Sequence, residues 1–374
     1  MIDQVLSLLV LLSLLVACAE APPPPAESPP AGLAALYATD FLVGAALGGR
    51  VIRDEDSLSR ALVVREYSTI TPENVMKWEK IQPTADTYNW GPADDYVAFG
   101  EEHDLFIVGH TLVWHSQLSD YVKQITDPGA MRTALRQHIG AVAGRYAGRI
   151  DGWDVVNEAL NDDGTYRESE FYRVLGEEYL TLAFRYAAEA APDAQLYYND
   201  YNMWNGEKRD GAIRMIEKIR ADGGRVDGIG MQGHYGISGP TIDTIEAAIE
   251  AYAAAGLPVM FTELDVTVLP NPWDLEGAEV SQNFENAPDM NPYPESLPDS
   301  VQTALAIRYA DLFRLFHRHR DKIERVTFWG TTDASSWLNG WPIRGRTNYP
   351  LLFDRKYRPK PAYDSVAAVA ATPR

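Results

Sequence analysis

Residues 150–202 contain a complete strand–helix–strand unit, and this unit indicates how the whole chain folds. It begins with IDGWDVVNE (residues 150–158), an apolar run that ends in polar residues. FYRVLGEEYLTLAFRYAAEAA (residues 171–191) follows with a helical pattern, and QLYYNDYN (residues 195–202) is again strand-like. A helix between two strands implies a crossover connection and therefore parallel pairing of the strands.

The same alternation extends in both directions from this unit. The expected strands are residues 41–48, 67–71, 105–114, 150–158, 195–202, 228–234, 258–266 and 325–333, and clear helical patterns cover residues 130–147, 171–191, 207–221, 241–255 and 301–320. Eight such units over 374 residues predict an α/β fold, a single (β/α)8 TIM barrel. An open doubly wound sheet is the alternative, but GAALG (residues 44–48) is not the glycine-rich phosphate loop such a sheet normally carries.

The first nineteen residues resemble an export signal. VLSLLVLLSLLVACA (residues 5–19) is too short to span a bilayer comfortably and has the length of a signal-peptide apolar region. It includes LVAC (residues 15–18), which resembles the lipobox of bacterial lipoproteins, whereas residues 17–19 also fit ordinary secretory cleavage. We expect a signal peptide at residues 1–19, lipidation at Cys18, and export as a membrane-anchored lipoprotein of a bacterial envelope or otherwise as a secreted protein.

A proline-rich spacer is expected at residues 20–35. APPPPAESPP (residues 21–30) has six prolines in ten residues, which favours a stiff, extended chain. Such a segment suits a tether between a lipid anchor and a folded domain. Residues 36–374 then form the (β/α)8 domain, with residues 269–300 as a long loop after the seventh strand.

Composition excludes several classes of function. Acidic residues outnumber basic ones by 53 to 33, and the net charge of −20 argues against binding to nucleic acid, whose phosphates need a basic surface. The only cysteine is Cys18, so an intrachain disulfide is impossible and a cysteine-based metal site is not expected. His317 and His319 are two apart on an expected helix and point in different directions. We expect no metal, no cofactor and a monomeric protein.

Two glutamates lie where expected strands stop being apolar. Glu158 ends the fourth strand, and Glu263 stands near the end of the seventh. The carboxyl ends of all strands open onto the same mouth of a barrel, where barrel enzymes place their chemistry. Glycoside hydrolysis needs two carboxyl groups that flank the bond to be cut, so the pair indicates an active site of this kind.

The neighbours of Glu263 fit the same chemistry. Glu263 and Asp265 are two apart on a strand and face one side, and so do Gln232 and His234 at the end of the sixth strand. We expect Gln232 and His234 to donate hydrogen bonds that keep Glu263 ionised, with Asp265 fixing the tautomer of His234. The charge on Glu263 would then raise the pKa of Glu158, which would carry the proton that the leaving oxygen needs.

Six motifs occur in the expected order along the strands. They are ENVMKW (residues 73–78), HTLVWH (110–115), WDVVNEA (153–159), NDYN (199–202), GLPVMFTELDV (256–266), and FWG (328–330) with SW (336–337). Together they resemble the endo-β-1,4-xylanases of glycoside hydrolase family 10, over roughly residues 36–371. The resemblance implies a retaining enzyme that cuts internal bonds of xylan and xylo-oligosaccharides by double displacement, with Glu158 as acid/base and Glu263 as nucleophile.

The resemblance also implies roles for residues around the two glutamates. Asn157 would hydrogen-bond the 2-hydroxyl of the sugar on the nucleophile. The implied substrate-binding residues are Glu73, Asn74, Lys77, Trp78, His110, Trp114, Tyr201, Trp329 and Trp337. Because xylose lacks the hydroxymethyl group of glucose, a roof of tryptophans over the subsite would exclude cellulose by volume.

Other functions remain as alternatives. A barrel hydrolase of cellulose or another β-glucan shares the two glutamates, although the Glu73, Asn74 and Lys77 set argues against it. A glycan-binding lipoprotein on an inactive barrel would be expected to lack one of the glutamates, and both are present. A metal-dependent hydrolase is the weakest alternative. Loop residues Trp273, Tyr293, Trp341 and Arg346 would shape leaving-side subsites or simply pack within the loops.

Overall fold

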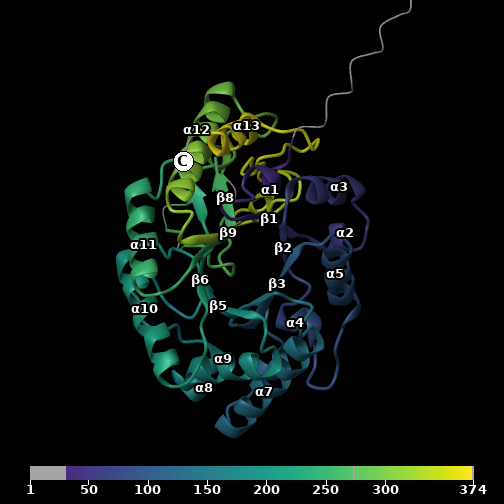
Figure 1. Cartoon of the computed structure of the whole chain (residues 1–374), viewed down its shortest axis with the longest axis vertical. Helices are drawn as coiled ribbons and strands as arrows, with labels where there is room; N and C mark the ends of the chain where they lie inside the picture. The colour runs from purple at the N-terminus through teal and green to yellow at the C-terminus, as the bar shows by residue number, and fades with distance from the viewer. Residues whose placement is uncertain (1–30, 273, 276, 286, 373–374) are drawn as a thin grey trace, which may run out of the picture. The chain divides into compact units, whose positions relative to one another are not determined.

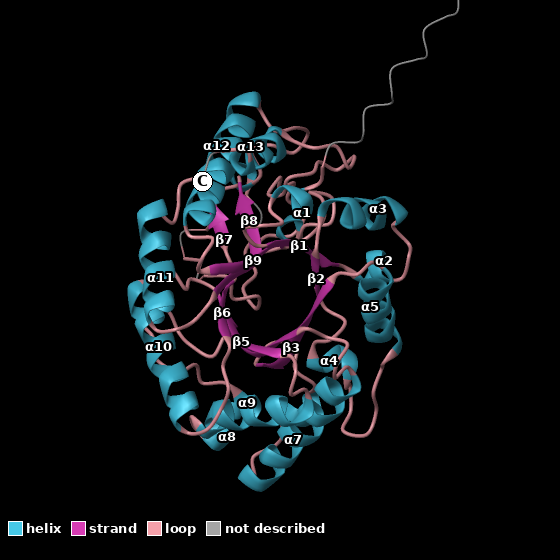
Figure 2. Ribbon diagram, in the orientation of Figure 1, coloured by secondary structure: helices cyan, strands magenta, loops and turns pink. Residues whose placement is uncertain are grey.

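A computed structural model describes residues 31–272, 274–275, 277–285 and 287–372. The expected signal peptide, Cys18, residues 20–30 of the spacer and Trp273 lie outside the described residues. Within the described part, parallel strands form a closed ring and helices surround it, as Figures 1 and 2 show.

The ring is a parallel β-barrel in which neighbours follow chain order. Its strands in the described chain are β1 (Leu42–Leu47), β2 (Thr69–Pro72), β3 (Phe106–Trp114), β4 (Gly152–Asn157), β5 (Gln195–Asp200), β6 (Gly228–Met231), β8 (Val259–Thr267) and β9 (Ile323–Phe328). Strand β6 pairs with β8 and β9 pairs with β1, so the ring closes. The predicted (β/α)8 barrel is confirmed.

The expected sixth strand is divided in two. It consists of β6 and a short β7 (His234–Gly236), which pairs with the carboxyl end of β8 in the register His234 to Asp265. Between them, Gly233 has a φ of +82°, a left-handed conformation that glycine adopts readily. The break turns Gln232 and His234 toward different partners, although strict alternation would have placed them on one face.

Helices connect consecutive strands on the outside of the barrel (Figure 2). The expected helix at residues 171–191 is two helices, since Gly176 with a φ of +60° separates them. The described helices are α1 (Leu33–Leu36), α2 (Gly49–Ile52), α3 (Ser57–Glu66), α4 (Trp78–Ile81), α5 (Gly91–Glu102), α6 (Asp120–Lys123), α7 (Pro128–Arg145), α8 (Glu170–Leu175), α9 (Glu178–Ala190), α10 (Gly206–Ala221), α11 (Ile242–Ala254), α12 (Asp299–Arg318) and α13 (Pro361–Ala370).

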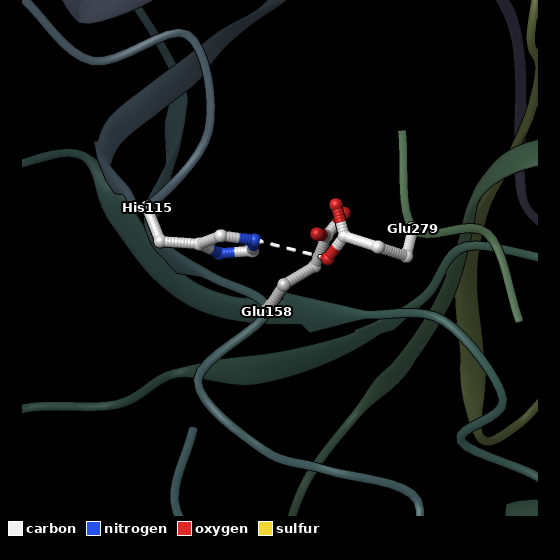
Figure 3. A group of neighbouring side chains, drawn as sticks. All are labelled: His115, Glu158 and Glu279. Atoms are coloured by element: carbon white, nitrogen blue, oxygen red, sulfur yellow. Dashed lines mark hydrogen bonds and ion pairs between the residues drawn. The ribbon is translucent and has the colours of Figure 1, made fainter. Parts of the chain in front are cut away.

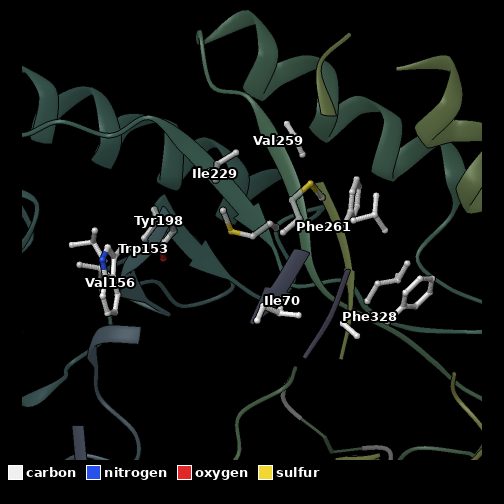
Figure 4. Packing of buried hydrophobic residues seen from close by; sticks show 14 of the residues in the cluster. Ile70, Trp153, Val156, Tyr198, Ile229, Val259, Phe261 and Phe328 are labelled. Carbon is white, nitrogen blue, oxygen red and sulfur yellow. The ribbon is translucent and has the colours of Figure 1, made fainter. Parts of the chain in front are cut away.

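Apolar side chains from the strands fill the core. Figure 4 shows part of this packing, with buried residues from six strands: Ile70, Trp153, Val156, Tyr198, Ile229, Val259, Phe261 and Phe328. Full burial of such a side chain stabilises the fold by roughly 1.5–3 kcal/mol. Gly109 in β3 has no side chain, which lets the ring of Trp153 lie against its backbone.

The packed domain includes residues just before residue 36. The side chain of Leu33 in α1 is fully buried, and its amide donates to Glu66 Oε2 at 3.2 Å. No helix in the described part of the chain combines the length and the apolarity that crossing a lipid bilayer requires.

Candidate active site

A cavity of about 160 Å³ lies at the carboxyl ends of the barrel strands. Most of the residues expected at the site line it: Glu73, Asn74, Lys77, His110, Trp114, Asn157, Glu158, Gln232, His234, Glu263, Trp329 and Trp337. A larger hollow of about 870 Å³ lies at the amino ends of β1, β8 and β9. The smaller cavity is the candidate site, because catalytic groups of (β/α)8 barrels gather at the carboxyl ends.

Glu158 follows β4 directly, and neutral hydrogen-bond donors surround its carboxyl group. Trp114 Nε1 donates to Oε2 at 2.8 Å, while Gln232 Nε2 and Asn157 Nδ2 donate to Oε1 at 2.9 and 3.1 Å. Burial raises the pKa of Glu158, and the negative charge of Asp200 adds to this. The hydrogen bonds and the nearby His115 act in the opposite direction but do not cancel the increase.

The backbone at Glu158 adopts a left-handed conformation with a φ of +57°. For a residue other than glycine, such a conformation costs about 1–3 kcal/mol and persists only where neighbours hold it. Here Glu158 N donates to Asn199 O at 2.9 Å, and Ala159 N donates to Tyr198 Oη at 3.1 Å. Arg167 Nε donates to Glu158 O at 3.1 Å. These bonds aim the Glu158 side chain into the cavity.

Glu263 lies within β8 and has an imidazole as well as an amide beside it. Asn199 Nδ2 donates to Oε1 at 2.8 Å, and His234 Nε2 lies 3.2 Å from Oε2. Burial alone would raise the pKa of Glu263. The hydrogen bond from His234, with the positive charges of His110, His234 and Lys77, brings that pKa below its ordinary value.

His234 lies between two carboxylates. Its Nδ1 is 3.1 Å from Asp265 Oδ1, and Asp265 Oδ2 accepts from Trp337 Nε1 at 2.8 Å. Burial acts to lower the pKa of His234, but Asp265 and Glu263 raise it to about 10. The ring is therefore protonated near neutral pH, and both nitrogens donate. We expected Asp265 to select one tautomer of His234. Because the ring is protonated on both nitrogens, Asp265 instead stabilises an imidazolium that donates to Glu263.

Amide side chains connect the two glutamates. Gln232 Nε2 donates to Glu158 and, at 3.3 Å, to Asn157 Oδ1, while Asn199 Nδ2 also donates to Asn157 Oδ1 at 2.9 Å. The expectation that Gln232 donates to Glu263 is wrong, because the turn at Gly233 directs Gln232 toward Glu158. Asn199 provides the amide donor to Glu263 instead.

A polar cluster occupies the side of the cavity near β2 and β3. Lys77 Nζ donates to Asn74 Oδ1 at 3.3 Å and to Gln117 Oε1 at 2.9 Å. Burial lowers the pKa of Lys77 and raises that of Glu73, while the opposite charges of the two groups oppose both shifts. His110 Nδ1 is 2.9 Å from Asp154 Oδ2. The cluster presents the charged and polar groups that recognise sugar hydroxyls.

Trp114, Trp329 and Trp337 line the cavity as expected, but two other aromatic residues do not. Trp78 stacks on His138 with ring centroids 3.6 Å apart and donates to Tyr121 Oη at 2.9 Å. Its ring is thus packed beneath α7, which corrects the expectation that it contacts substrate. Tyr201 lies beside the cavity, with Lys208 Nζ 3.8 Å from its ring centroid.

The structure also brings together residues that sequence spacing did not reveal. His115, Glu158 and Glu279 each place one polar atom within 4.8 Å of the others (Figure 3). Their atoms are possible metal ligands. However, Arg167 Nη1 already donates to Glu279 Oε2 at 2.7 Å, and its positive charge disfavours a cation there. The sequence signal for Gln117 and Glu279 was weak, because both lie on loops.

A glutamate whose environment favours its protonated form, beside one held ionised at the mouth of a (β/α)8 barrel, is the arrangement of a barrel glycoside hydrolase. Comparisons with known proteins agree. Residues 32–369 match the family described as Glycosyl hydrolase family 10. The chain therefore belongs to glycosyl hydrolase family 10.

Individual relatives cover most of the chain. Endo-1,4-beta-xylanase A of Xylanibacter ruminicola is 42% identical in an alignment of 332 residues that covers 87% of this chain and 90% of the relative. Endo-1,4-beta-xylanase B of Paenibacillus barcinonensis is 37% identical over 88% of this chain and 96% of its own. A solved GH10 endoxylanase from a sugarcane soil metagenome aligns with a TM-score of 0.88 and 46% identity, covering 90% of this chain and 100% of that structure.

Proposed function

We propose that this family 10 enzyme is a retaining endo-1,4-β-xylanase in which Glu158 is the acid/base and Glu263 is the nucleophile. The observation that carries the proposal is the opposite effect of the surroundings on two equally buried carboxyl groups, with the pKa of Glu158 raised and that of Glu263 lowered. The two steps of a retaining mechanism require this combination of a proton donor and an ionised nucleophile.

The reaction uses the pair twice. In the first step, a Glu263 carboxylate oxygen bonds to the anomeric carbon, the glycosidic C–O bond breaks, and the Glu158 proton goes to the leaving oxygen. The ester on Glu263 then carries no charge, so Glu158 is left as a carboxylate beside it. In the second step, Glu158 takes a proton from water, the water oxygen bonds to the anomeric carbon, and Glu263 is released as a carboxylate.

Residues lining the cavity support a xylan chain as the substrate. Glu73, Asn74, Lys77 and His110 hold sugar hydroxyls on the non-reducing side of the bond. Asn157 then bonds the 2-hydroxyl of the sugar on Glu263. Trp114, Trp329 and Trp337 enclose the reacting sugar and leave little room for a hydroxymethyl group: Trp329 and Trp337 flank His234 with ring centroids 6.4 and 4.9 Å away.

An adjoining hollow would bind the sugar units of the leaving group. Its volume is about 360 Å³; it shares His234 and Ala278 with the cavity, and Trp204, Tyr235 and Trp341 are among its lining residues. Aromatic rings of this kind provide flat apolar surfaces for sugar rings. Because the hollow adjoins the cavity, it offers space for sugar units beyond the bond that is cut, as endo-cleavage requires.

Product analysis on arabinoxylan and carboxymethylcellulose tests the function. Rapid release of short xylo-oligosaccharides, with the β-anomer first in proton NMR, is the expected result, and Glu263→Ala should abolish it. Activity on cellulose alone would refute the choice of substrate while leaving the two glutamates in place. Xylan binding without hydrolysis would favour a glycan-binding protein instead.

We also propose that the chain is exported and tethered through lipid on Cys18. The support is the LVAC sequence at residues 15–18 and the proline-rich segment after it. Labelling cells with a palmitate analogue should mark the wild type in the membrane fraction and leave Cys18→Ala unlabelled. A soluble, unlabelled wild type with an N-terminus near residue 20 would show ordinary secretory cleavage.

We also propose that the protein is a monomer. In the described residues, the exposed large apolar side chains are Leu58, Val64 and Ile307, which lie on α3 and α12. Isolated side chains of this kind do not make the contiguous apolar patch of a stable interface. Light scattering on the purified domain should give the mass of one chain; the mass of two would contradict it.

A further inference from the structure

Glu279 extends from the long loop after β8 into the surroundings of Glu158. Figure 3 shows Glu279 approaching His115 from the opposite side, with the carboxyl group of Glu158 next to both. The neighbours of Glu279 in sequence, Ala278 and Val280, line the active-site cavity. Glu279 therefore anchors the part of this loop that lies beside the acid/base.

The two side chains that bind the Glu279 carboxyl group, Arg167 and His115, also support Glu158. Arg167 Nη1 donates to Glu279 Oε2 at 2.7 Å, and its Nε donates to the main-chain oxygen of Glu158. His115 Nε2 lies 3.2 Å from the same Glu279 oxygen and follows Trp114, whose indole donates to the Glu158 carboxyl group. The Arg167–Glu279–His115 bridge therefore joins the strand ends of β3 and β4 on the two sides of the acid/base.

The charge of Glu279 has a defined effect on its neighbour. A hydrogen bond from His115, with help from Ser281 N–H and the charge of Arg167, lowers the pKa of Glu279 to about 2, although burial opposes this. Glu279 is then ionised wherever a glycoside hydrolase works. A negative charge within 4.8 Å makes it harder for Glu158 to lose its proton.

Other charged groups face Glu158 from the surrounding elements. Asp200 on β5 adds negative charge, although Lys208 on α10 pairs with it at 2.9 Å, whereas His115 after β3 and Arg167 after β4 act as positive charges. Lys77 stands above the ring of Trp114, 4.6 Å from its centroid. Neutralising Glu279 leaves Arg167 without its carboxylate partner, so the lost negative charge of Glu279 and the unpaired positive charge of Arg167 act in the same direction on Glu158.

We propose that Glu279 is a positioning residue for the acid/base, which holds Arg167 and His115 in place and keeps Glu158 protonated during attack on the glycosidic bond. This inference rests on the proposed function, since it assumes that Glu158 donates the proton. It assigns to the loop after β8 a role in the chemistry as well as in shaping the cavity.

The test is the pH dependence of kcat/KM for Glu279→Gln. Glutamine keeps an oxygen for Arg167 but removes the charge, so the basic limb should move to lower pH by about one unit. Arg167→Gln should move the same limb to higher pH. Glu295→Gln, an exposed change on the same loop, is the matched control and should leave the profile unchanged.

A second substrate separates proton donation from general damage to the site. An aryl β-xylobioside with a dinitrophenolate leaving group needs no proton, so Glu279→Gln should cleave it at nearly the wild-type rate while it is several-fold slower on xylan above neutral pH. An unchanged basic limb, or equal losses on both substrates, would overturn the proposal for Glu279.

The Glu158→Gln variant distinguishes failure of this inference from failure of the proposed function. If Glu158→Gln loses xylan hydrolysis but Glu279→Gln keeps the wild-type basic limb, the inference alone is wrong. If Glu158→Gln remains fully active on xylan, the acid/base assignment is wrong and the role of Glu279 is refuted with it.

Discussion

Glu158 and Glu263 are buried to the same extent, but their surroundings suit them to different chemical roles. Their exposed fractions are 4% and 5%, and both lie where barrel strands reach the cavity. Yet the pKa of Glu158 is raised and the pKa of Glu263 is lowered. Burial acts in the same direction on both, so depth alone cannot set the two roles.

The opposite pKa shifts arise from the kind of group that donates hydrogen bonds to each carboxyl group. Glu158 receives hydrogen bonds from an indole and two amides, which are neutral and only partly compensate for lost water. Glu263 receives one from His234, whose own pKa is raised to about 10 by Asp265 and Glu263. A charged donor is roughly twice as strong as a neutral one, and here, together with the positive charges of His110 and Lys77, it reverses the effect of burial.

Glu263→Ala should produce the largest effect, because it removes the group that forms the covalent intermediate. We expect kcat on xylan to fall by at least about 10⁴-fold, the scale seen when a catalytic nucleophile is deleted. Added azide should restore part of the rate and give a product of inverted configuration. Retained activity with a β-anomer product would contradict the assignment.

Glu158→Gln should follow, with a loss that depends on the substrate. General acid catalysis contributes typically about 10²–10⁴-fold, so hydrolysis of xylan should fall by that amount. Formation of the intermediate from a dinitrophenyl xylobioside, measured as a burst of phenolate, should be almost unaffected. Equal losses for both substrates would mean that Glu158 does not act as an acid.

Removing one hydrogen-bond donor at a time tests the comparison between Glu158 and Glu263. His234→Leu removes the largest effect that opposes burial of Glu263 and leaves only the weaker ones of His110 and Lys77, so the pKa of Glu263 rises and the acidic limb of kcat/KM moves to higher pH. We expect a rate loss of about 10²-fold at the optimum, typical for removing one preorganised donor. Both quantities come from the same pH–rate measurement on xylotetraose.

Gln232→Leu is the matched change on the other carboxyl group. Loss of its N–H donor removes a stabiliser of the Glu158 carboxylate, so the pKa of Glu158 rises further and the basic limb moves to higher pH. If His234→Leu moved the basic limb, or Gln232→Leu moved the acidic one, the assignment of the two limbs would be reversed.

Trp337→Phe should give the smallest effect. It keeps an aromatic ring at the cavity but removes the N–H that Asp265 accepts at 2.8 Å. Loss of one hydrogen bond to a charged group that acts through His234 should reduce kcat about ten-fold, in line with a contribution of about 1.5 kcal/mol. A reduction above 100-fold would show that the ring itself matters more than its hydrogen bond.

Sequence patterns predicted the strands and the catalytic residues that lie on them. The eight strands, the positions of Glu158 and Glu263 at their ends, and the pairing of His234 with Asp265 followed from alternation and strand order. These features depend on local periodicity and on a topology in which all carboxyl ends meet.

The features that sequence analysis missed depend on where loops and turns lead. Because Gly233 has a left-handed backbone conformation, the side chain of Gln232 donates to Glu158 instead of Glu263. Trp78 was placed among the sugar-binding residues, but the short helix α4 turns its ring onto His138. Glu279 and Arg167 meet across 112 positions of sequence, and no periodic pattern predicts such a contact between two loops.

Trapping of the covalent intermediate tests the central claim most directly. A 2-deoxy-2-fluoro-β-xylobioside with a dinitrophenolate leaving group should inactivate the enzyme, and peptide mass spectrometry should locate one fluoroxylobiosyl group on Glu263. The same label on Glu158, or hydrolysis to the α-anomer without any label, would contradict a mechanism in which the charged donor at His234 makes Glu263 the nucleophile.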